Sequence, residues 1–307
     1  MSNNPVTLRL GTRASPLALA QAKLVKRALL EAHGWAESSI EIVPVVASGD
    51  KVQDRPLADV GGKALWTKEL DAWLISGEID FSVHSMKDVE TIRPLEFTTA
   101  AMLPRADVRD RLLGVEAFSQ IPHGAKLGTS APRRTAQIKQ MRPDIEITLF
   151  RGNVQTRLRK LAEGEVCATL LAAAGLNRLE MDNVGIAIPV ETMLPAPAQG
   201  AIGIECLVSN VPVLNWLDQI NHKDTRDCVF AERAVLAALA ADCRSPVAAL
   251  AIKQGDYIWL RAEIFSMDGA EQVTAERRFR ADNYDEVAIL AEELLSGASP
   301  QLRATFG

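Results

Sequence analysis

Short apolar runs alternate with helical apolar periods along the first half of the chain, a pattern typical of an α/β fold. The first run, 8–10, precedes a helix whose expected N-cap is Ser15 and whose first residue is Pro16. The apolar stripe of that helix is expected to comprise Leu17, Ala20, Leu24 and Ala28. Further strands are predicted at 40–46 and 79–83, with a helix between them whose stripe comprises Leu65, Trp66, Leu70, Trp73 and Leu74.

A second unit of the same kind begins after residue 100. Apolar runs predict strands at 126–128, 145–150, 166–172 and 201–206. Helices are expected to begin at Pro132 and just after Arg151-Gly152-Asn153. Strands that alternate with helices indicate a doubly wound, mostly parallel sheet. The sequence therefore predicts two such α/β domains.

The last third has a different pattern. An alanine-rich helix is predicted at 226–241, with Cys228, Ala231, Val235 and Leu239 on one face. Alternating strands at 257–265 and 272–279 flank Asp268-Gly269, a hairpin signal, and a closing helix is expected at 286–295. This is a small α+β domain. With 307 residues the chain exceeds one core, and the predicted domains are 1–100 with 196–219, 101–195, and 220–307.

Composition is that of an ordinary soluble protein, with 48% hydrophobic and 24% charged residues. No apolar run reaches the roughly 18 residues of a membrane helix, and the first residues are not those of a signal peptide. The four cysteines show no CxxC spacing and the four histidines no HExxH. We therefore expect no disulfide, no metal site and no membrane association, and a cytoplasmic protein. No exposed apolar stripe is evident, so we expect a monomer.

Charge is unevenly distributed along the chain. Residues 105–160 carry nine Arg and three Lys against three Asp and two Glu, a balance of +7 within a chain of net charge −5. Aromatic residues are only 5% and none interleave the arginines, which argues against nucleic acid, and no Walker A or GxGxxG pattern is present. The segment therefore favours a focused anion site, although a solvated helix face would have the same charge.

Three loops place arginines in the turn that follows a strand. They are 11–13, 128–134 and 151–157. Helix N-termini offer free N–H groups, and guanidinium forks bind carboxylates through two parallel hydrogen bonds, so several carboxylates on one small ligand fit these loops. Structural salt bridges are the alternative.

Two further residues carry candidate chemistry. Asp88 follows a strand end beside Lys87, and among cations we expect it to stay ionised and to stabilise a transient organic cation. His84 could assist it, or could be purely structural. Cys243 lies past a helix C-terminus with Arg244 beside it, where a thiolate would be favoured.

Together these segments resemble the porphobilinogen deaminase (hydroxymethylbilane synthase) family. The matching stretches are 11–19, 60–63, 83–88, 151–157, 198–201, 231–233 and Cys243. The resemblance implies three α/β domains, the first two similar to periplasmic binding proteins around a cleft. It also implies the activity: four porphobilinogen molecules are joined head to tail with loss of ammonia, giving hydroxymethylbilane, a step of tetrapyrrole and heme biosynthesis.

The same resemblance implies the site. A dipyrromethane cofactor is attached to Cys243 through a thioether, and Asp88 stabilises the cation left when ammonia departs. Cofactor and substrate contacts fall on Arg13, Ser15, Lys63, Ser85, Lys87, Thr129, Ser130, Arg133, Arg134, Arg151, Arg157 and Arg178, with Gln199 and Gly200 in a loop that lines the cleft.

The chain departs from the family pattern at several positions. They are Asp59, Ala64, Glu90 in place of a proline, Ala131, Pro132, and Ala241-Asp242 before the cysteine. These departures motivate a second hypothesis: a catalytically impaired relative that uses its arginines to bind a polycarboxylate.

Overall fold

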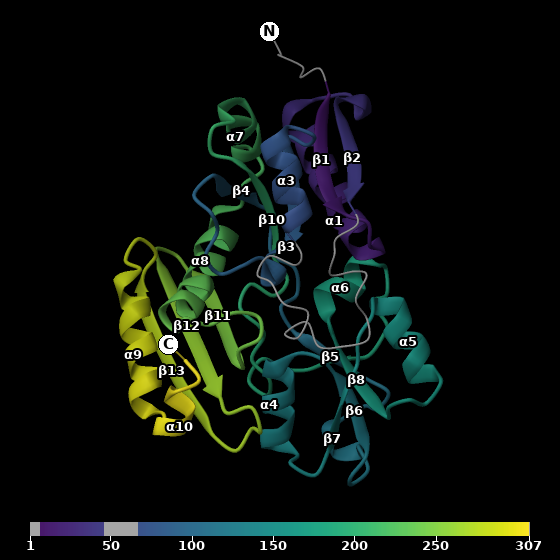
Figure 1. Cartoon of the computed structure of the whole chain (residues 1–307), viewed down its shortest axis with the longest axis vertical. Coiled ribbons are helices and arrows are strands. Elements are labelled where there is room, and N and C mark those ends of the chain that lie inside the picture. The colour runs from purple at the N-terminus through teal and green to yellow at the C-terminus, as the bar shows by residue number, and fades with distance from the viewer. Residues whose placement is uncertain (1–6, 46–66, 307) are drawn as a thin grey trace. The chain divides into compact units, whose positions relative to one another are not determined.

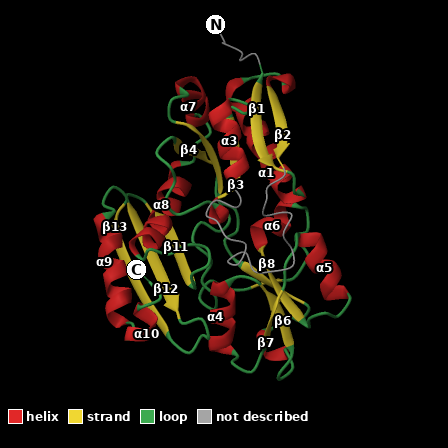
Figure 2. Cartoon of the chain, viewed as in Figure 1, coloured by secondary structure: helices red, strands yellow, loops and turns green. Residues whose placement is uncertain are grey.

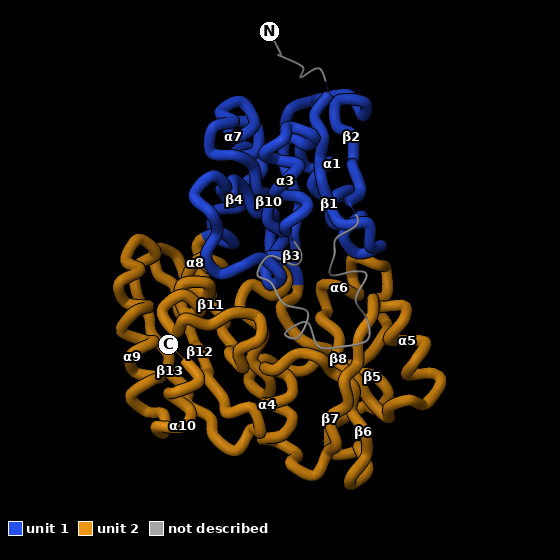
Figure 3. Tube along the Cα trace, in the orientation of Figure 1, with its two compact units in different colours: residues 1–106, 201–226 blue, residues 107–200, 227–307 orange. Residues whose placement is uncertain are grey.

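The computed structural model describes residues 7–45 and 67–306 (Figure 1). This part of the chain has the predicted α/β fold, with two five-stranded sheets and one three-stranded antiparallel sheet (Figure 2). It divides into two units, Met1–Ala106 with Ala201–Arg226, and Asp107–Gly200 with Asp227–Gly307 (Figure 3). The three-domain limits given above stay a prediction.

The sheet of the first unit has the order β2-β1-β3-β10-β4. Its strands are β1 (Leu8–Arg13), β2 (Ile40–Val45), β3 (Phe81–Ser85), β4 (Phe97–Met102) and β10 (Ile202–Leu207). Four strands run in one direction and β10 runs against both its neighbours. The helices of this unit are α1 (Pro16–His33), α3 (Lys68–Ser76) and α7 (Val211–Asp218), with short 3₁₀ turns at Glu37–Ser39 and Met86–Asp88.

Helix α1 begins and ends as its sequence predicts, but its buried face is displaced by one residue. Ser15 accepts a hydrogen bond from the Ala18 amide at 3.3 Å, Pro16 is the first residue, and Gly34 ends the helix at φ 65°. The buried residues are Ala18, Gln21, Ala22, Val25 and Leu29. The predicted stripe flanks this face. Apolar residues cover much of the helix surface, so periodicity alone did not fix which side is buried.

The first sheet of the second unit has the order β7-β6-β8-β5-β9 and repeats the same plan. Its strands are β5 (Asp110–Leu113), β6 (Lys126–Thr129), β7 (Glu146–Leu149), β8 (Ala168–Ala172) and β9 (Ile186–Ala187). Here β5 is the strand that runs against its neighbours, so both sheets are mostly parallel, as predicted. Its helices are α4 (Pro132–Met141), α5 (Val154–Ala162) and α6 (Ala173–Arg178), with a 3₁₀ turn at Phe118–Gln120.

The small α+β domain is built on the sheet β11-β12-β13. The strands are β11 (Val247–Gln254), β12 (Tyr257–Phe265) and β13 (Gln272–Arg280), and the helices are α8 (Lys223–Ala238), α9 (Asp285–Gly297) and α10 (Pro300–Arg303). One face of the sheet packs on α8 and α9, and the predicted apolar face of α8 is buried there. Within the second unit, Phe265 and Leu250 of this sheet pack against Ala136 of α4.

Among the described residues, none of the helices combines the length and the apolar character that a membrane span requires.

Candidate active site

The first group of predicted site residues lies at one edge of the first sheet. Strands β1 and β3 are parallel neighbours, so Arg13 at the end of β1 and Ser85 at the end of β3 come to the same edge. Gly11 allows this packing, because a Cβ there would lie 2.3 Å from Ile79 Cδ1. The Gly-Thr-Arg motif is thus explained by close packing at glycine and by the position of its arginine.

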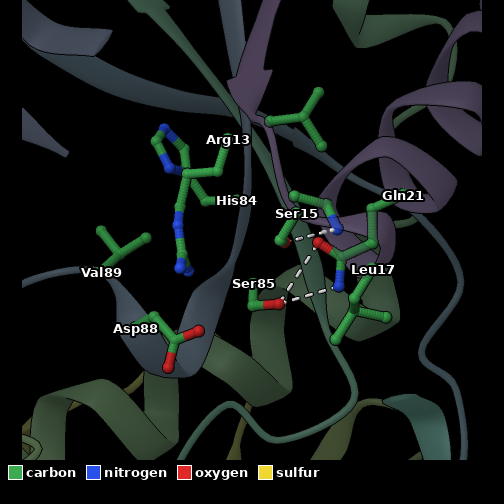
Figure 4. A pocket seen from close by; sticks show the side chains of 10 residues that line it. Arg13, Ser15, Leu17, Gln21, His84, Ser85, Asp88 and Val89 are labelled. Atoms are coloured by element: carbon green, nitrogen blue, oxygen red, sulfur yellow. Dashed lines mark hydrogen bonds between the residues drawn. The ribbon is translucent and has the colours of Figure 1, made fainter. Parts of the chain in front are cut away.

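A pocket lies at this edge (Figure 4). It encloses about 410 Å³, part of it open to solvent. In the close-up the Arg13 guanidinium points toward the Asp88 carboxylate. The end of β1, the beginning of α1 with its N-cap, β3 and the turn after β3 contribute its lining residues: Arg13, Ser15, Leu17, Ala18, Gln21, Val83, His84, Ser85, Asp88 and Val89. Four predicted site residues, Arg13, Ser15, Ser85 and Asp88, are therefore brought together.

Gln21 is a pocket residue that sequence reasoning missed. Its amide Nε2 donates to Ser85 Oγ at 2.8 Å, and its side chain is buried. The contact ties α1 to the end of β3 and orients the serine hydroxyl. The available signal was a polar residue on the helix face between Ala18 and Val25, where an apolar one is expected.

Met86 anchors the turn that carries Lys87 and Asp88. Its side chain is fully buried, and its amide donates to the Ala201 carbonyl on the neighbouring chain segment at 3.1 Å. Gly203 makes room, since a Cβ there would lie 2.0 Å from the Met86 sulfur. Lys87 and Asp88 are both partly exposed, and Asp88 lines the pocket.

His84 lines the pocket but is buried and hydrogen-bonded inside the domain. Its Nε2 lies 2.8 Å from Ser82 Oγ and 3.4 Å from Glu205 Oε2. Burial lowers the pKa of His84, and the charges of Arg93 and Arg13 act in the same direction, against Glu205. The imidazole is therefore neutral at pH 7, which favours the structural role left open for it.

In the second unit, Arg133 and Arg134 converge on a buried acid, Asp110. Each guanidinium donates to one Asp110 oxygen at 2.7 Å, and all three side chains are buried. Burial alone would raise the pKa of Asp110, but the two arginines hold it well below its ordinary value. This is a buried ion triad.

The other terminal nitrogen of each guanidinium is also used within the protein, whereas Nε of both arginines is buried without a hydrogen-bond partner among the described residues. Arg133 donates to Gln137 and to the Leu194 carbonyl, both at 2.9 Å, and Arg134 donates to the Leu170 carbonyl at 3.0 Å. The geometry favours the structural alternative for this pair over the ligand-binding role that we predicted. Asp110 itself was missed, although it stands between two arginines at the start of a strand.

Gln199 joins the same triad. Its Nε2 donates to Asp110 Oδ1 at 2.9 Å and to the Val108 carbonyl at 2.7 Å, and it is buried. Thr129 is also buried, and its Oγ1 accepts from the Ala131 amide at 3.2 Å, whereas Ser130 is exposed. Of this group, Ser130 is the residue most open to a ligand.

Arg178, at the end of α6, is mostly buried and meets the loop of Gly200. It donates to the Gly200 carbonyl at 2.6 Å, and burial lowers its pKa to about 10. Within the described residues no carboxylate forms an ion pair with it. A buried guanidinium whose charge lacks a counter-charge is a suitable partner for an anionic group of a ligand.

Arg151 and Arg157 flank the beginning of α5. Asn153 caps this helix by accepting from the Thr156 amide at 2.8 Å, and Arg157 Nε donates to the Gly152 carbonyl at 3.0 Å. Gly152 has φ 119°, and a Cβ there would lie 2.6 Å from Thr156. The Arg-Gly-Asn motif thus forms a tight turn with arginines on both sides. Both arginines are partly exposed.

Cys243 is exposed in the loop between α8 and β11. The neighbouring Arg244 donates through Nε to Asp242 at 2.9 Å, which raises the pKa of Arg244. The acid that departs from the family pattern therefore engages the guanidinium that we expected to favour the thiolate. Lys63, Asp59 and Ala64 lie outside the described residues.

Sequence comparison decides the family. The model of the porphobilinogen deaminase dipyromethane cofactor binding domain matches residues 8–214, and the model of the porphobilinogen deaminase C-terminal domain matches 227–296. The chain belongs to the porphobilinogen deaminase family. The resemblance inferred from the motifs is thereby confirmed.

Relatives agree over almost the whole chain. The porphobilinogen deaminase of Sphingopyxis alaskensis is 54% identical over 99% of this chain and 97% of its own length. The porphobilinogen deaminase of Paracoccus denitrificans is 47% identical over 89% of this chain and 88% of its own length. The chloroplastic porphobilinogen deaminase of Pisum sativum is 45% identical over 97% of this chain and 84% of its own length. A solved periplasmic solute-binding protein from Desulfovibrio salexigens also matches, with TM-score 0.44 at 10% identity over 72% of this chain and 73% of its own.

Proposed function

We propose that this chain is an active porphobilinogen deaminase in which Asp88 is the catalytic carboxylate and Cys243 carries the dipyrromethane cofactor. It is a transferase that joins four porphobilinogen molecules head to tail, releases ammonia at each addition, and yields hydroxymethylbilane. The observation that carries the role of Asp88 is the pocket in which it meets Arg13, Ser15 and Ser85. The motifs at 11–19 and 83–88, far apart in the sequence, both contribute residues to this pocket.

The chemistry at this pocket needs one anionic group. When the aminomethyl carbon–nitrogen bond of porphobilinogen breaks, ammonia leaves and a methylene cation conjugated to the pyrrole remains. A carboxylate held beside that carbon lowers the energy of the developing positive charge. Asp88 is proposed to do this, and to hold the pyrrole N–H, while Arg13 and Lys87 bind the acetate and propionate of the substrate.

The cofactor, when bound, supplies the pyrrole end to which the first porphobilinogen is added. The residues present fit such a group. Cys243 offers an exposed thiol for the thioether, and Arg178 offers a buried charge that no acid balances within the described residues. Ser130, Arg151 and Arg157 are the other accessible donors proposed to bind its carboxylates, and Lys63 keeps its predicted role. The cleft between the two α/β domains stays a prediction.

Other predicted contacts receive different roles. Arg133, Arg134 and Gln199 are proposed to hold the second unit together around Asp110, and Thr129 to shape the turn before α4. Gln199 and Gly200 keep a part in the proposed site through their loop, in which the Gly200 carbonyl accepts a hydrogen bond from Arg178. We also propose a cytoplasmic monomer that binds porphobilinogen and no nucleic acid.

Intact-protein mass spectrometry with an ammonia-release assay tests the proposal. Wild-type protein should carry added covalent mass that is absent from Cys243→Ser, and should release ammonia from porphobilinogen. Asp88→Ala should keep the added mass and lose turnover. The matched control is Asp80→Ala at the other end of β3, where the acid pairs with Arg9 at 3.4 Å. That variant should keep turnover.

Two results would reject the assignment. Wild-type protein without added mass that also fails to acquire the cofactor in vitro and releases no ammonia would favour the impaired, polycarboxylate-binding relative. Near-normal turnover in Asp88→Ala would remove Asp88 from the mechanism while leaving the activity in place.

A further inference from the structure

The turn that carries Asp88 leads into a segment without helix or strand. After the 3₁₀ turn Met86–Asp88, the chain makes no regular element until β4 begins at Phe97. Val89, directly after Asp88, is buried, but Ile92 and Leu95 further along are 74% and 92% exposed, so apolar packing holds only the beginning of this segment. A catalytic carboxylate needs a fixed position, and beyond Met86 and Val89 the segment needs an anchor at its other end.

Arg93 is the anchor on the other side. Its guanidinium donates to Asp71 of α3 at 2.6 and 3.1 Å and to Glu90 at 2.7 Å. Its Nε donates to Glu205 of β10 at 3.2 Å. The side chain is only 10% exposed, so these contacts are shielded from water.

Three carboxylates thus converge on one guanidinium. Burial by itself would lower the pKa of Arg93, yet its hydrogen bond with Asp71 and the charges of Glu205 and Asp71 raise it. The charge is therefore permanent, and the segment is tied both to a helix and to the central part of the sheet. Cation–π contact with Phe97, 5.0 Å from the ring centroid, fixes the same side chain further.

The cluster reaches the pocket along a second route. Glu205 is fully buried. Its Oε1 accepts one hydrogen bond from Arg93 Nε at 3.2 Å and another from Thr99 Oγ1 at 3.3 Å. Its Oε2 lies 3.4 Å from His84 Nε2, and His84 lines the Asp88 pocket. Glu205 therefore lies next to both the histidine of the pocket wall and the arginine that holds the segment after Asp88.

Glu90 gives this arrangement a feature particular to the chain. It stands two residues after Asp88, where the family resemblance leads one to expect proline. A proline would restrict the backbone there by its ring. Glu90 instead binds Arg93, three residues further on, so an ion pair replaces a covalent restriction.

We propose that Arg93, held by three carboxylates, is a positioning residue for Asp88. It does not touch substrate. It fixes the segment after the 3₁₀ turn so that the Asp88 carboxylate stays where the substrate cation develops. The inference rests on the proposed function, because it concerns the geometry of that catalytic group.

Steady-state ammonia release by Arg93→Met tests it, with cofactor loading checked by intact mass. A misplaced carboxylate should lower kcat by about 10- to 100-fold while KM stays within about threefold, since a shift near 1 Å has effects of that size. Arg93→Lys keeps one charge and should recover most of the loss. Glu90→Gln, a partly exposed and milder change, should lower kcat by about threefold by the same reasoning.

The matched control is Arg277→Met. Arg277 of β13 also binds two carboxylates, Glu286 at 2.8 Å and Glu293, but lies in the small α+β domain. It should lose stability without a change in kcat. If the Arg93 and Glu90 variants, fully loaded with cofactor, kept the wild-type kcat, or if Arg277→Met lowered kcat equally, the inference would be overturned. Absence of ammonia release from the wild type would instead reject the proposed function.

Discussion

Asp110 holds two buried guanidinium groups, so its replacement by asparagine should strongly destabilise the second unit. The side chain is fully buried, and Arg133 and Arg134 both donate to it at 2.7 Å. Asparagine has nearly the same shape and keeps one acceptor oxygen, but it removes the negative charge. Two positive charges then remain in the interior without their counter-charge.

The expected magnitude follows from that imbalance. Removing one partner of a buried ion pair costs about 3–5 kcal/mol, because an uncompensated charge is left behind. Burial lowers the pKa of Arg133, and Arg134 acts in the same direction, while Asp110 and the nearby Glu263 oppose it. Glu263 would therefore supply some compensation when the Asp110 charge is removed. We therefore expect a loss of about 3 kcal/mol, at the lower end of this range. The loop of Gln199, which donates to Asp110, should loosen with it.

The effect has a defined dependence on pH. The pKa of Asp110 is lowered in the folded state, so the unfolded chain takes up a proton first as the pH falls. The stabilising contribution of Asp110 is complete above its pKa in the unfolded chain, about 3.9, and is lost as the pH falls through its lower pKa in the folded protein. The difference between wild type and Asp110→Asn should thus be constant from pH 5 to 8, and should shrink only in strong acid.

Urea unfolding followed by fluorescence and circular dichroism measures this difference. The matched control is Asp107→Asn, three residues earlier, whose acid pairs with the exposed Arg109 at 2.7 Å. An exposed pair contributes at most about 1 kcal/mol. If Asp110→Asn lost no more stability than Asp107→Asn, the interpretation of the triad as a structural ion cluster would be wrong.

Two other predictions concern a residue proposed to bind the substrate and the surroundings of the proposed cofactor cysteine. Arg178→Met should raise KM for porphobilinogen about tenfold or more, since a charge-assisted hydrogen bond contributes roughly 1.5–3 kcal/mol. The variant should be as stable as wild type, because the arginine is buried without a paired carboxylate among the described residues; an unchanged KM would contradict its role. Asp242→Gly should speed alkylation of Cys243 in cofactor-free protein by about two- to fivefold, because it frees the Arg244 guanidinium beside the thiol. Arg280→Ala, in an exposed pair with Asp282, is the control, and equal rates in the two variants would refute the effect.

The sequence predicted the main elements of the fold because their signals are local. Ser15 and Pro16 marked the beginning of α1, and alternation marked β12 over all its residues. Short strands such as β5 and β9 were missed, since four and two residues carry no readable period. The buried face of α1 was displaced, because alanine and leucine occur on adjacent sides of that helix.

The grouping of residues at one pocket was predictable where a motif and a strand end coincide, as for Arg13, Ser85 and Asp88. It was less so for arginines. An arginine at a helix end reads the same in sequence whether it is proposed to bind a ligand, as Arg178 at the end of α6 is, or binds an internal acid, as Arg133 and Arg134 at the beginning of α4 do. The deciding partner, Asp110, lies more than twenty residues away, and pairing over that distance is fixed by the sheet.

His84 should give the fold a second pH dependence, separate from that of Asp110. Burial lowers its pKa, helped by Arg93 and Arg13 and opposed by Glu205 and Asp71, so the unfolded chain binds this proton first. Stability should therefore fall as the pH drops below about 6.5, with a slope of up to about 1.4 kcal/mol per pH unit.

Urea unfolding of His84→Gln from pH 7.5 to 5 tests this, because glutamine cannot take up the proton and the slope should decrease. His123→Gln on an exposed turn is the control and should keep the wild-type slope. An unchanged slope in His84→Gln would mean that the buried site of His84 accommodates imidazolium, and that burial does not hold this histidine neutral.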